Sequence, residues 1–240
     1  MDRREPQKGS LMNHFEVAPE KLPYWKYLTG KEKSMVRNGI YLKNYKKREF
    51  IYRPGKDDCL GSLYLLQGDL RAYILSPDGR EVTLFRLHEE DTCVFSATCL
   101  FRQITFETFL VAEEDCFVMV VNATIFSKLT EENLAVRCFL YELLSERFSA
   151  VMLTMQQILF FSFDRRLAYF LLQEQERLHT DEIHMTHEQI ARYLGSAREV
   201  VARMLKRFSE AGLVDLNRGL IRITDREALL KIAEPSLITR

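Results

Sequence analysis

The sequence contains no long apolar run, no cysteine pattern typical of disulfides and no net charge, and each absence excludes a class of protein. No apolar run approaches the roughly 20 residues that a membrane-spanning helix requires. The polar residues 1–16 lack the apolar core of a signal peptide. With 47% hydrophobic and 28% charged residues, the chain has the balance of a soluble globular protein. We therefore expect no membrane partner and no export.

Cysteine and catalytic motifs are equally sparse. Five cysteines, an odd number scattered through 240 residues, do not form the disulfide framework of a secreted protein. We therefore expect a cytoplasmic protein. The sequence has no nucleophile elbow, P-loop, H-E-x-x-H or dinucleotide-binding glycine motif. It thus predicts no catalytic residues and no dedicated metal motif, and a β-barrel enzyme acting on a small ligand stays only as the alternative.

Charge is balanced overall but not along the chain. The 34 basic and 34 acidic residues cancel, yet residues 192–222 carry seven Lys or Arg against three Asp or Glu. Residues 84–132 show the reverse, three basic against nine acidic. A basic segment within a neutral chain favours specific binding of double-stranded DNA over general polyanion binding.

Residues 185–205 fall inside that basic segment and predict two short helices joined by a tight turn. Thr186 caps the first helix with Gln189 completing a capping box, Gly195 allows the turn, and Ser196 caps the second helix. The apolar faces would be formed by Ile190, Ala191 and Leu194, then by Val200, Val201, Met204 and Leu205. Arg198, Glu199, Arg203, Lys206 and Arg207 remain for the outer face, as a DNA recognition helix requires. The alternative is an ordinary amphipathic hairpin with a solvated face.

A predicted β-hairpin follows directly. Residues 213–216 and 220–224 are short apolar strands around the turn residues Asn217, Arg218 and Gly219. A helix-turn-helix followed by such a hairpin is a winged helix. Arg218 is then expected at the tip of the wing, within reach of phosphate.

The middle of the chain predicts strands and then one long helix. The strands, at residues 40–45, 49–52, 63–67, 70–75, 82–88, 105–112 and 116–122, favour a small antiparallel barrel or sandwich. A helix from residue 131 to about 161 carries apolar residues near a heptad period, which favours a dimer seam besides core packing. Asp164 is expected to cap the next helix. We therefore predict an α+β protein with an arm (1–21), a β-barrel that senses an effector (22–128), a dimerisation helix (129–163) and a winged helix-turn-helix (164–240).

This order of elements resembles the Crp/Fnr family, named for the cyclic-AMP receptor protein and Fnr, over about residues 22–232. The carriers are LYLLQGDL at 63–70, SPDGREV at 76–82, and Thr186, Ile190, Ala191, Leu194, Gly195, Arg198, Glu199 and Arg203. The resemblance implies a cupin-like or cyclic-nucleotide-binding-like barrel and a homodimeric transcription regulator that contacts RNA polymerase. It also implies a palindromic TGTGA-like site read by Arg198, Glu199 and Arg203.

The expected effector pocket departs from that family. Cyclic-nucleotide binders carry Gly-Glu and Arg-Ser/Thr pairs, where this chain has Val94-Phe95 and Phe106-Glu107. This argues against cyclic AMP. The iron–sulfur cysteines of the Fnr branch have no counterpart before Cys59. The candidate effector-responsive residues are Cys93, Cys99, Cys116 and His88. Several roles for these residues stay open: a thiol switch, a metal or iron–sulfur site, a heme pocket, or plain core packing. A regulator without an effector is also open.

Overall fold

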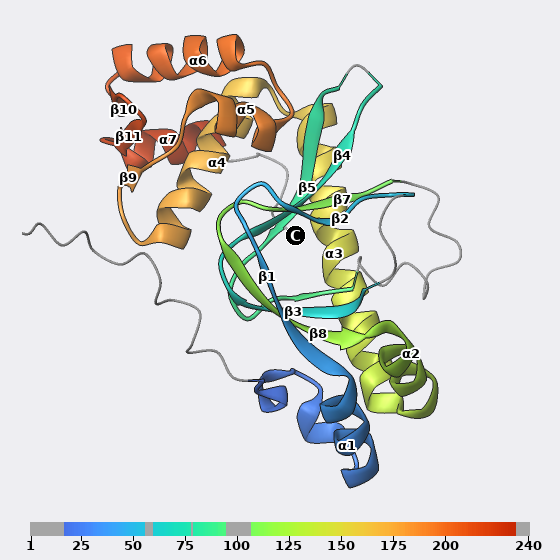
Figure 1. The fold of residues 1–240 in the computed structure, drawn as a ribbon. Helices are drawn as coiled ribbons and strands as arrows, with labels where there is room; N and C mark the ends of the chain where they lie inside the picture. The colour runs from blue at the N-terminus through green and yellow to red at the C-terminus, as the bar shows by residue number, and fades with distance from the viewer. Residues whose placement is uncertain (1–16, 56–59, 78, 95–106, 234–240) are drawn as a thin grey trace, which may run out of the picture.

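The computed structural model describes residues 17–55, 60–77, 79–94 and 107–233 (Figure 1). The described chain begins with two 3-10 turns, η1 (Pro19–Lys21) and η2 (Trp25–Tyr27), followed by helix α1 (Gly30–Gly39). Thr29 and Glu32 form a reciprocal capping box that starts α1. These elements cover one end of the β domain (Figure 1).

The β domain consists of two antiparallel four-stranded sheets. Their strands are β1 (Ile40–Tyr45), β2 (Phe50–Tyr52), β3 (Gly61–Gln67), β4 (Leu70–Leu75), β5 (Glu81–Leu87), β6 (Thr92–Cys93), β7 (Phe109–Ala112) and β8 (Cys116–Asn122). The strand orders are β1-β8-β3-β6 and β2-β7-β4-β5. Apolar side chains of both sheets, such as Leu63, Leu70 and Val118, form a shared core. Each predicted strand of this domain has its counterpart here, with the predicted strand 105–112 represented by β7, while the two-residue β6 was not predicted.

Two helices follow the sheets, α2 (Ala123–Glu132) and α3 (Leu134–Phe160). The prediction of one helix from residue 131 is wrong in its start. Asn133 is extended, and its side-chain oxygen accepts hydrogen bonds from the backbone of Ala135 and Val136, so it caps α3. The 27 residues of α3 span about 40 Å, and the helix runs along the β domain from end to end (Figure 1).

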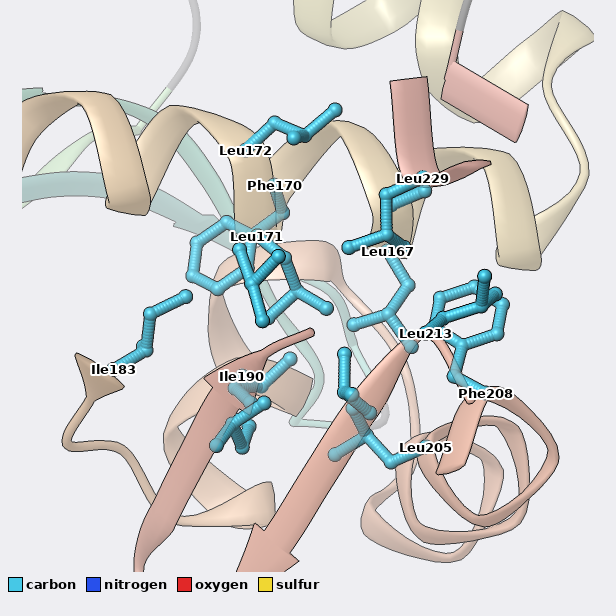
Figure 2. Close-up of a cluster of buried hydrophobic side chains, with 14 of the residues drawn as sticks. Leu167, Phe170, Leu171, Leu172, Ile183, Ile190, Leu205, Phe208, Leu213 and Leu229 are labelled. Carbon is cyan, nitrogen blue, oxygen red and sulfur yellow. The ribbon is translucent and has the colours of Figure 1, made fainter. Parts of the chain in front are cut away.

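The C-terminal domain contains α4 (Phe163–Leu178), β9 (Glu182–Ile183), α5 (His187–Leu194), α6 (Arg198–Glu210), β10 (Val214–Asn217), β11 (Leu220–Ile223) and α7 (Arg226–Ala233). Its core joins α4, α5, α6 and the three-stranded sheet β10-β11-β9 through residues such as Leu167, Ile190 and Leu205 (Figure 2). Asp164 does not cap α4 as predicted, because the helix already begins at Phe163 and Ser162 is its N-cap.

The fold agrees with the predicted α+β class: antiparallel sheets, a long helix and a winged helix-turn-helix, in that order. Within the described ranges, no helix combines the length and apolar character needed to cross a membrane.

Candidate DNA-binding surface and its contact with the β domain

Helices α5 and α6 form the predicted helix-turn-helix. The hydroxyl of Thr186 accepts a hydrogen bond from the backbone N–H of Gln189 (3.2 Å), and the Gln189 side chain accepts one from the Thr186 N–H (2.8 Å). This confirms the predicted capping box. Gly195 adopts φ +58°, the left-handed geometry that ends α5.

Ser196 does not cap the second helix, so that prediction is wrong. Its backbone N–H donates to the carbonyl of Ala191 (2.9 Å), which closes the end of α5. The chain enters α6 one residue later, with Ala197 as N-cap and no side-chain cap hydrogen bond. The turn therefore uses one more residue than the sequence pattern indicated.

The outer face of α6 is charged and exposed, whereas Val201, Leu205 and Phe208 on the inner face are buried. The exposed side chains are Arg198, Glu199, Arg203, Lys206 and Arg207. In the described part of the chain, Lys206 pairs with Glu210 at 3.7 Å, while Arg198, Glu199 and Arg203 have no ion-pair partner within 4 Å. Their hydrogen-bonding groups are therefore available to a ligand, and α6 lies on the side of the domain away from the sheets (Figure 1).

The wing is a tight antiparallel hairpin. Asn217 pairs with Leu220, so Arg218 and Gly219 alone form the loop, with Gly219 at φ +75°. Arg218 is exposed at the tip, as predicted. β11 also pairs with β9, a strand that the sequence did not predict because it is only two residues long.

The first helix of the motif contacts the β domain through a polar network. The Tyr193 hydroxyl donates to Glu113 Oε2 (2.9 Å), and the other oxygen of Glu113 accepts from Arg71 Nε (2.6 Å). Thr83 Oγ1 donates to the carbonyl of Arg192 (3.2 Å). Burial, reinforced by the charge of Glu113, raises the pKa of Tyr193 to about 12, so the phenol stays protonated and donates.

A second contact centres on a buried carboxylate of α4. Glu174 pairs with Arg86 of β5 and, at 2.8 Å, with Arg177 of its own helix. A guanidinium nitrogen of Arg177 also lies 3.6 Å from the Asp69 carboxylate. The other carboxylate oxygen of Asp69 lies 2.6 Å from His88 Nδ1. Sequence reasoning missed this network, because its members lie on three separate segments.

The candidate effector residues lie in two environments. Cys93 and Cys116 are buried in the core between the two sheets, and His88 pairs with Asp69. Burial raises the pKa of Cys116 to about 12, so its thiol stays protonated and donates to the carbonyls of Asp69 and Glu114. The position of Cys99 lies outside the described residues. Over the ranges described, no group of three His, Cys, Asp or Glu side chains is placed to hold a metal ion.

Val94, which aligns with the first residue of the Gly-Glu pair of cyclic-nucleotide binders, is buried among apolar side chains. Val94 is 1% exposed and belongs to an apolar cluster with Tyr64, Leu66 and Met119. Glu107 is exposed, and Phe95 and Phe106 lie outside the described residues. Val94 therefore packs against the helices at the end of the β domain, not in the core between the two sheets.

Comparison with known proteins gives consistent matches to both domains. A family described as the Crp-like helix-turn-helix domain matches residues 165–232, and the cyclic nucleotide-binding domain matches residues 42–133. A solved structure of a Crp/Fnr-family protein from Eubacterium rectale is 40% identical, covers 89% of this chain and 99% of its own, and has a TM-score of 0.83.

Two curated relatives are more distant. The cAMP-activated global transcriptional regulator Vfr of Pseudomonas aeruginosa is 26% identical over 72% of this chain and 84% of its own length. The anaerobic regulatory protein of Haemophilus influenzae is 26% identical over 79% of this chain and 75% of its own length.

Proposed function

Because the chain belongs to the Crp/Fnr family of transcriptional regulators, we propose that it is a homodimer that reads a palindromic DNA site through Arg198, Glu199 and Arg203. The supporting observation is that these three side chains project from the first turns of α6, exposed and without ion-pair partners among the described residues. Members of this family regulate transcription and are not enzymes, so the alternative of a β-barrel enzyme is dropped.

The chemistry of the triplet matches a TGTGA-like half-site. Arginine donates two hydrogen bonds to guanine O6 and N7, and glutamate accepts one from cytosine N4. Lys206, Arg207 and the wing residue Arg218 supply positive charge for phosphates. Thr186 and Ser196 lie at the start of α5 and in the turn, where backbone N–H groups and hydroxyls contact the DNA backbone in this motif.

An exposed apolar stripe on α3 supports the homodimer. The stripe follows the d and a positions of a heptad repeat, with steps of four and three residues. Its apolar members are Leu134, Cys138, Tyr141, Phe148, Met152, Met155 and Leu159, and Ser145 is the one polar residue among them. Phe148 is 66% exposed and Leu159 is 61% exposed, which is unusual for large apolar side chains in a monomer. Val136, Leu140 and Leu143, on the opposite side, are core residues.

The effector that we propose is a small molecule other than cyclic AMP. The residue pairs Val94-Phe95 and Phe106-Glu107 support this, since cyclic-nucleotide binders carry Gly-Glu and Arg-Ser/Thr pairs at the aligned positions. A contact with RNA polymerase and a place in the cytoplasm belong to the same proposal, on the strength of the family.

The DNA site is tested by fluorescence anisotropy on a TGTGA-N6-TCACA duplex and a scrambled duplex. Arg203→Ala should weaken binding to the palindrome by about 1–3 kcal/mol and leave the scrambled duplex nearly unchanged. The control is Arg226→Ala, because Arg226 is also an exposed arginine but lies on α7. If Arg203→Ala weakens binding to both duplexes equally, Arg203 contacts phosphate. If the wild type binds both duplexes with equal affinity, the proposed DNA sequence is excluded.

The dimer is tested through Cys138, which is exposed at an a position of the stripe. In a parallel helix pair the two copies of this residue face each other across the seam, within reach of a disulfide. Mild oxidation should therefore cross-link the wild type into a covalent dimer, and Cys138→Ser should stay uncross-linked. Phe148→Glu should yield a monomer in sedimentation experiments. A wild type that sediments as a monomer would exclude the homodimer.

A further inference from the structure

A cavity of about 500 Å³ lies where the β domain meets the C-terminal domain, apart from the interior of the sheets. Its walls come from three directions: the edge strand β5, the middle of α3, and one side of α4. The end of α5 closes the fourth side with Tyr193 and Leu194. This volume falls within the range of pockets that hold small organic molecules.

The α4 wall presents a polar stripe to the cavity. Arg166, Tyr169, Gln173 and Arg177 line it at steps of three and four residues, which places them on one face of the helix. Glu176, the residue before Arg177, also lines the cavity, so the end near Arg166 is the one that favours an acidic group. The Gln173 amide donates to the Tyr169 hydroxyl at 3.1 Å, so this part of the stripe is already ordered. The opposite wall is largely apolar, with Leu153 and Ile158 of α3. A ligand with one acidic end and an apolar body suits such walls.

Of the three arginines that line the cavity, Arg166 is the one without an ion-pair partner among the described residues, although its guanidinium lies 5.4 Å from the centre of the Phe163 ring. Arg86 and Arg177 share the buried carboxylate of Glu174, but in the part of the chain that the structure describes no carboxylate lies within 4 Å of Arg166. One of its amino groups donates to the Leu194 carbonyl at 3.0 Å, and its Nε is buried without a hydrogen-bond acceptor. Burial lowers the pKa of Arg166, since no anion offsets the desolvation of its charge.

We propose that this cavity binds a small organic anion whose carboxylate or phosphate group pairs with Arg166. A guanidinium offers five N–H donors in a planar fork, so Arg166 can keep the Leu194 carbonyl through one amino group and still bind an acidic group through the other. Tyr169 and Gln173 supply hydrogen bonds further along the ligand.

The position of the cavity connects the ligand to DNA binding, a step that rests on the proposed function. Leu194 is the last residue of α5 and precedes the turn into α6. The cavity walls belong to both domains, so a bound anion stabilises one arrangement of these domains over others. The anion is in this way the effector of the regulator.

The test uses inorganic pyrophosphate and citrate as probes, titrated into the full chain by calorimetry at constant ionic strength. Wild type should bind at least one of them, and Arg166→Gln should weaken that binding by about tenfold or more, as for a lost hydrogen bond to a charged group. Arg226→Gln removes the same charge from the exposed surface of α7 and should leave the affinity within about twofold of wild type.

Two further variants separate lost binding from lost folding. Arg166→Lys keeps the charge and should retain affinity within a few-fold. Gln173→Trp places a bulky ring at the cavity from an exposed helix position, where the fold tolerates it, and should weaken binding as Arg166→Gln does. Absence of binding of both anions to wild type, or equal affinity of wild type and Arg166→Gln, overturns the proposed site.

Anisotropy on the two duplexes, with and without the anion, distinguishes this proposal from the proposed function. Selective DNA binding by a protein that binds neither anion overturns the cavity site and leaves the regulator intact. If the protein binds the anion through Arg166 but does not prefer the palindrome, the cavity site is supported and the proposed DNA sequence is refuted.

Discussion

Replacing Glu174 by Gln should release the C-terminal domain from the β domain. Glu174 is fully buried on α4, and its carboxylate pairs with Arg86 of β5 and with Arg177. Removing one partner of a buried pair typically costs about 3–5 kcal/mol, because the other charge stays desolvated. Gln keeps a neutral acceptor, and Arg177 keeps Asp69 at 3.6 Å. We therefore expect the lower end, a loss of about 3 kcal/mol in the free energy of unfolding.

Urea denaturation measures this loss with two probes. The single tryptophan, Trp25, packs against the end of the β domain, so its fluorescence reports on that domain. Circular dichroism at 222 nm includes the helices of the C-terminal domain. The free energy of unfolding should fall by about 2–3 kcal/mol per molar urea. Glu174→Gln should therefore lower the urea midpoint of the dichroism signal by about 1 M and that of the fluorescence signal by less. The two domains would then unfold in two separate transitions.

Glu176→Gln is the matched control, since Glu176 lies two residues along on the same helix but is exposed. It should change stability by no more than about 0.5 kcal/mol. If both variants lower both midpoints equally and slightly, then the Glu174 network does not hold the two domains together, and the reasoning is refuted.

Three further predictions concern local features. Gly195→Ala should lower the free energy of unfolding by about 1 kcal/mol or more. The loss should exceed that of Gly212→Ala in thermal unfolding. Both glycines have positive φ, but of the two only a Cβ at Gly195 would approach the β domain, at 3.1 Å. Thr186→Ala should lose about 0.5–2 kcal/mol of stability through its capping box, while Thr186→Ser should lose little. Iodoacetamide at pH 8 should modify Cys116 only after unfolding, as mass spectrometry would show, because its thiol is buried and its pKa is raised to about 12.

Local features of this fold follow from the sequence because they depend on neighbouring residues. The capping box at Thr186, the left-handed Gly195 and the wing turn at Arg218 each need only residues within one turn or hairpin. The strands likewise follow from alternation and turn residues. Ser196 shows the limit, since whether it or Ala197 caps α6 depends on one backbone hydrogen bond to Ala191.

The contacts between domains could not be predicted, because they join residues far apart in the chain. Arg71 is the second residue of a predicted strand, where an arginine indicates a solvent-facing position, yet it is 2% exposed. Its burial requires Glu81, the first residue of β5, and Glu113, which directly follows β7. α3 has a related ambiguity, since it is apolar on both sides. Periodicity alone cannot separate Leu140 in the core from Phe148 on the exposed stripe.

The arrangement of α5 makes the recognition helix depend on the β domain. α5 and α6 share one core, through residues such as Ile190 and Leu205, so they move as a unit (Figure 2). The end of α5 is held on the β domain by Tyr193 and by the Arg192 carbonyl, and within its own domain by Arg166 through Leu194. A change in the position of α6 relative to the sheets must therefore break or rebuild these hydrogen bonds. A ligand that alters any of them changes DNA affinity, and by linkage DNA changes the affinity for that ligand by the same factor.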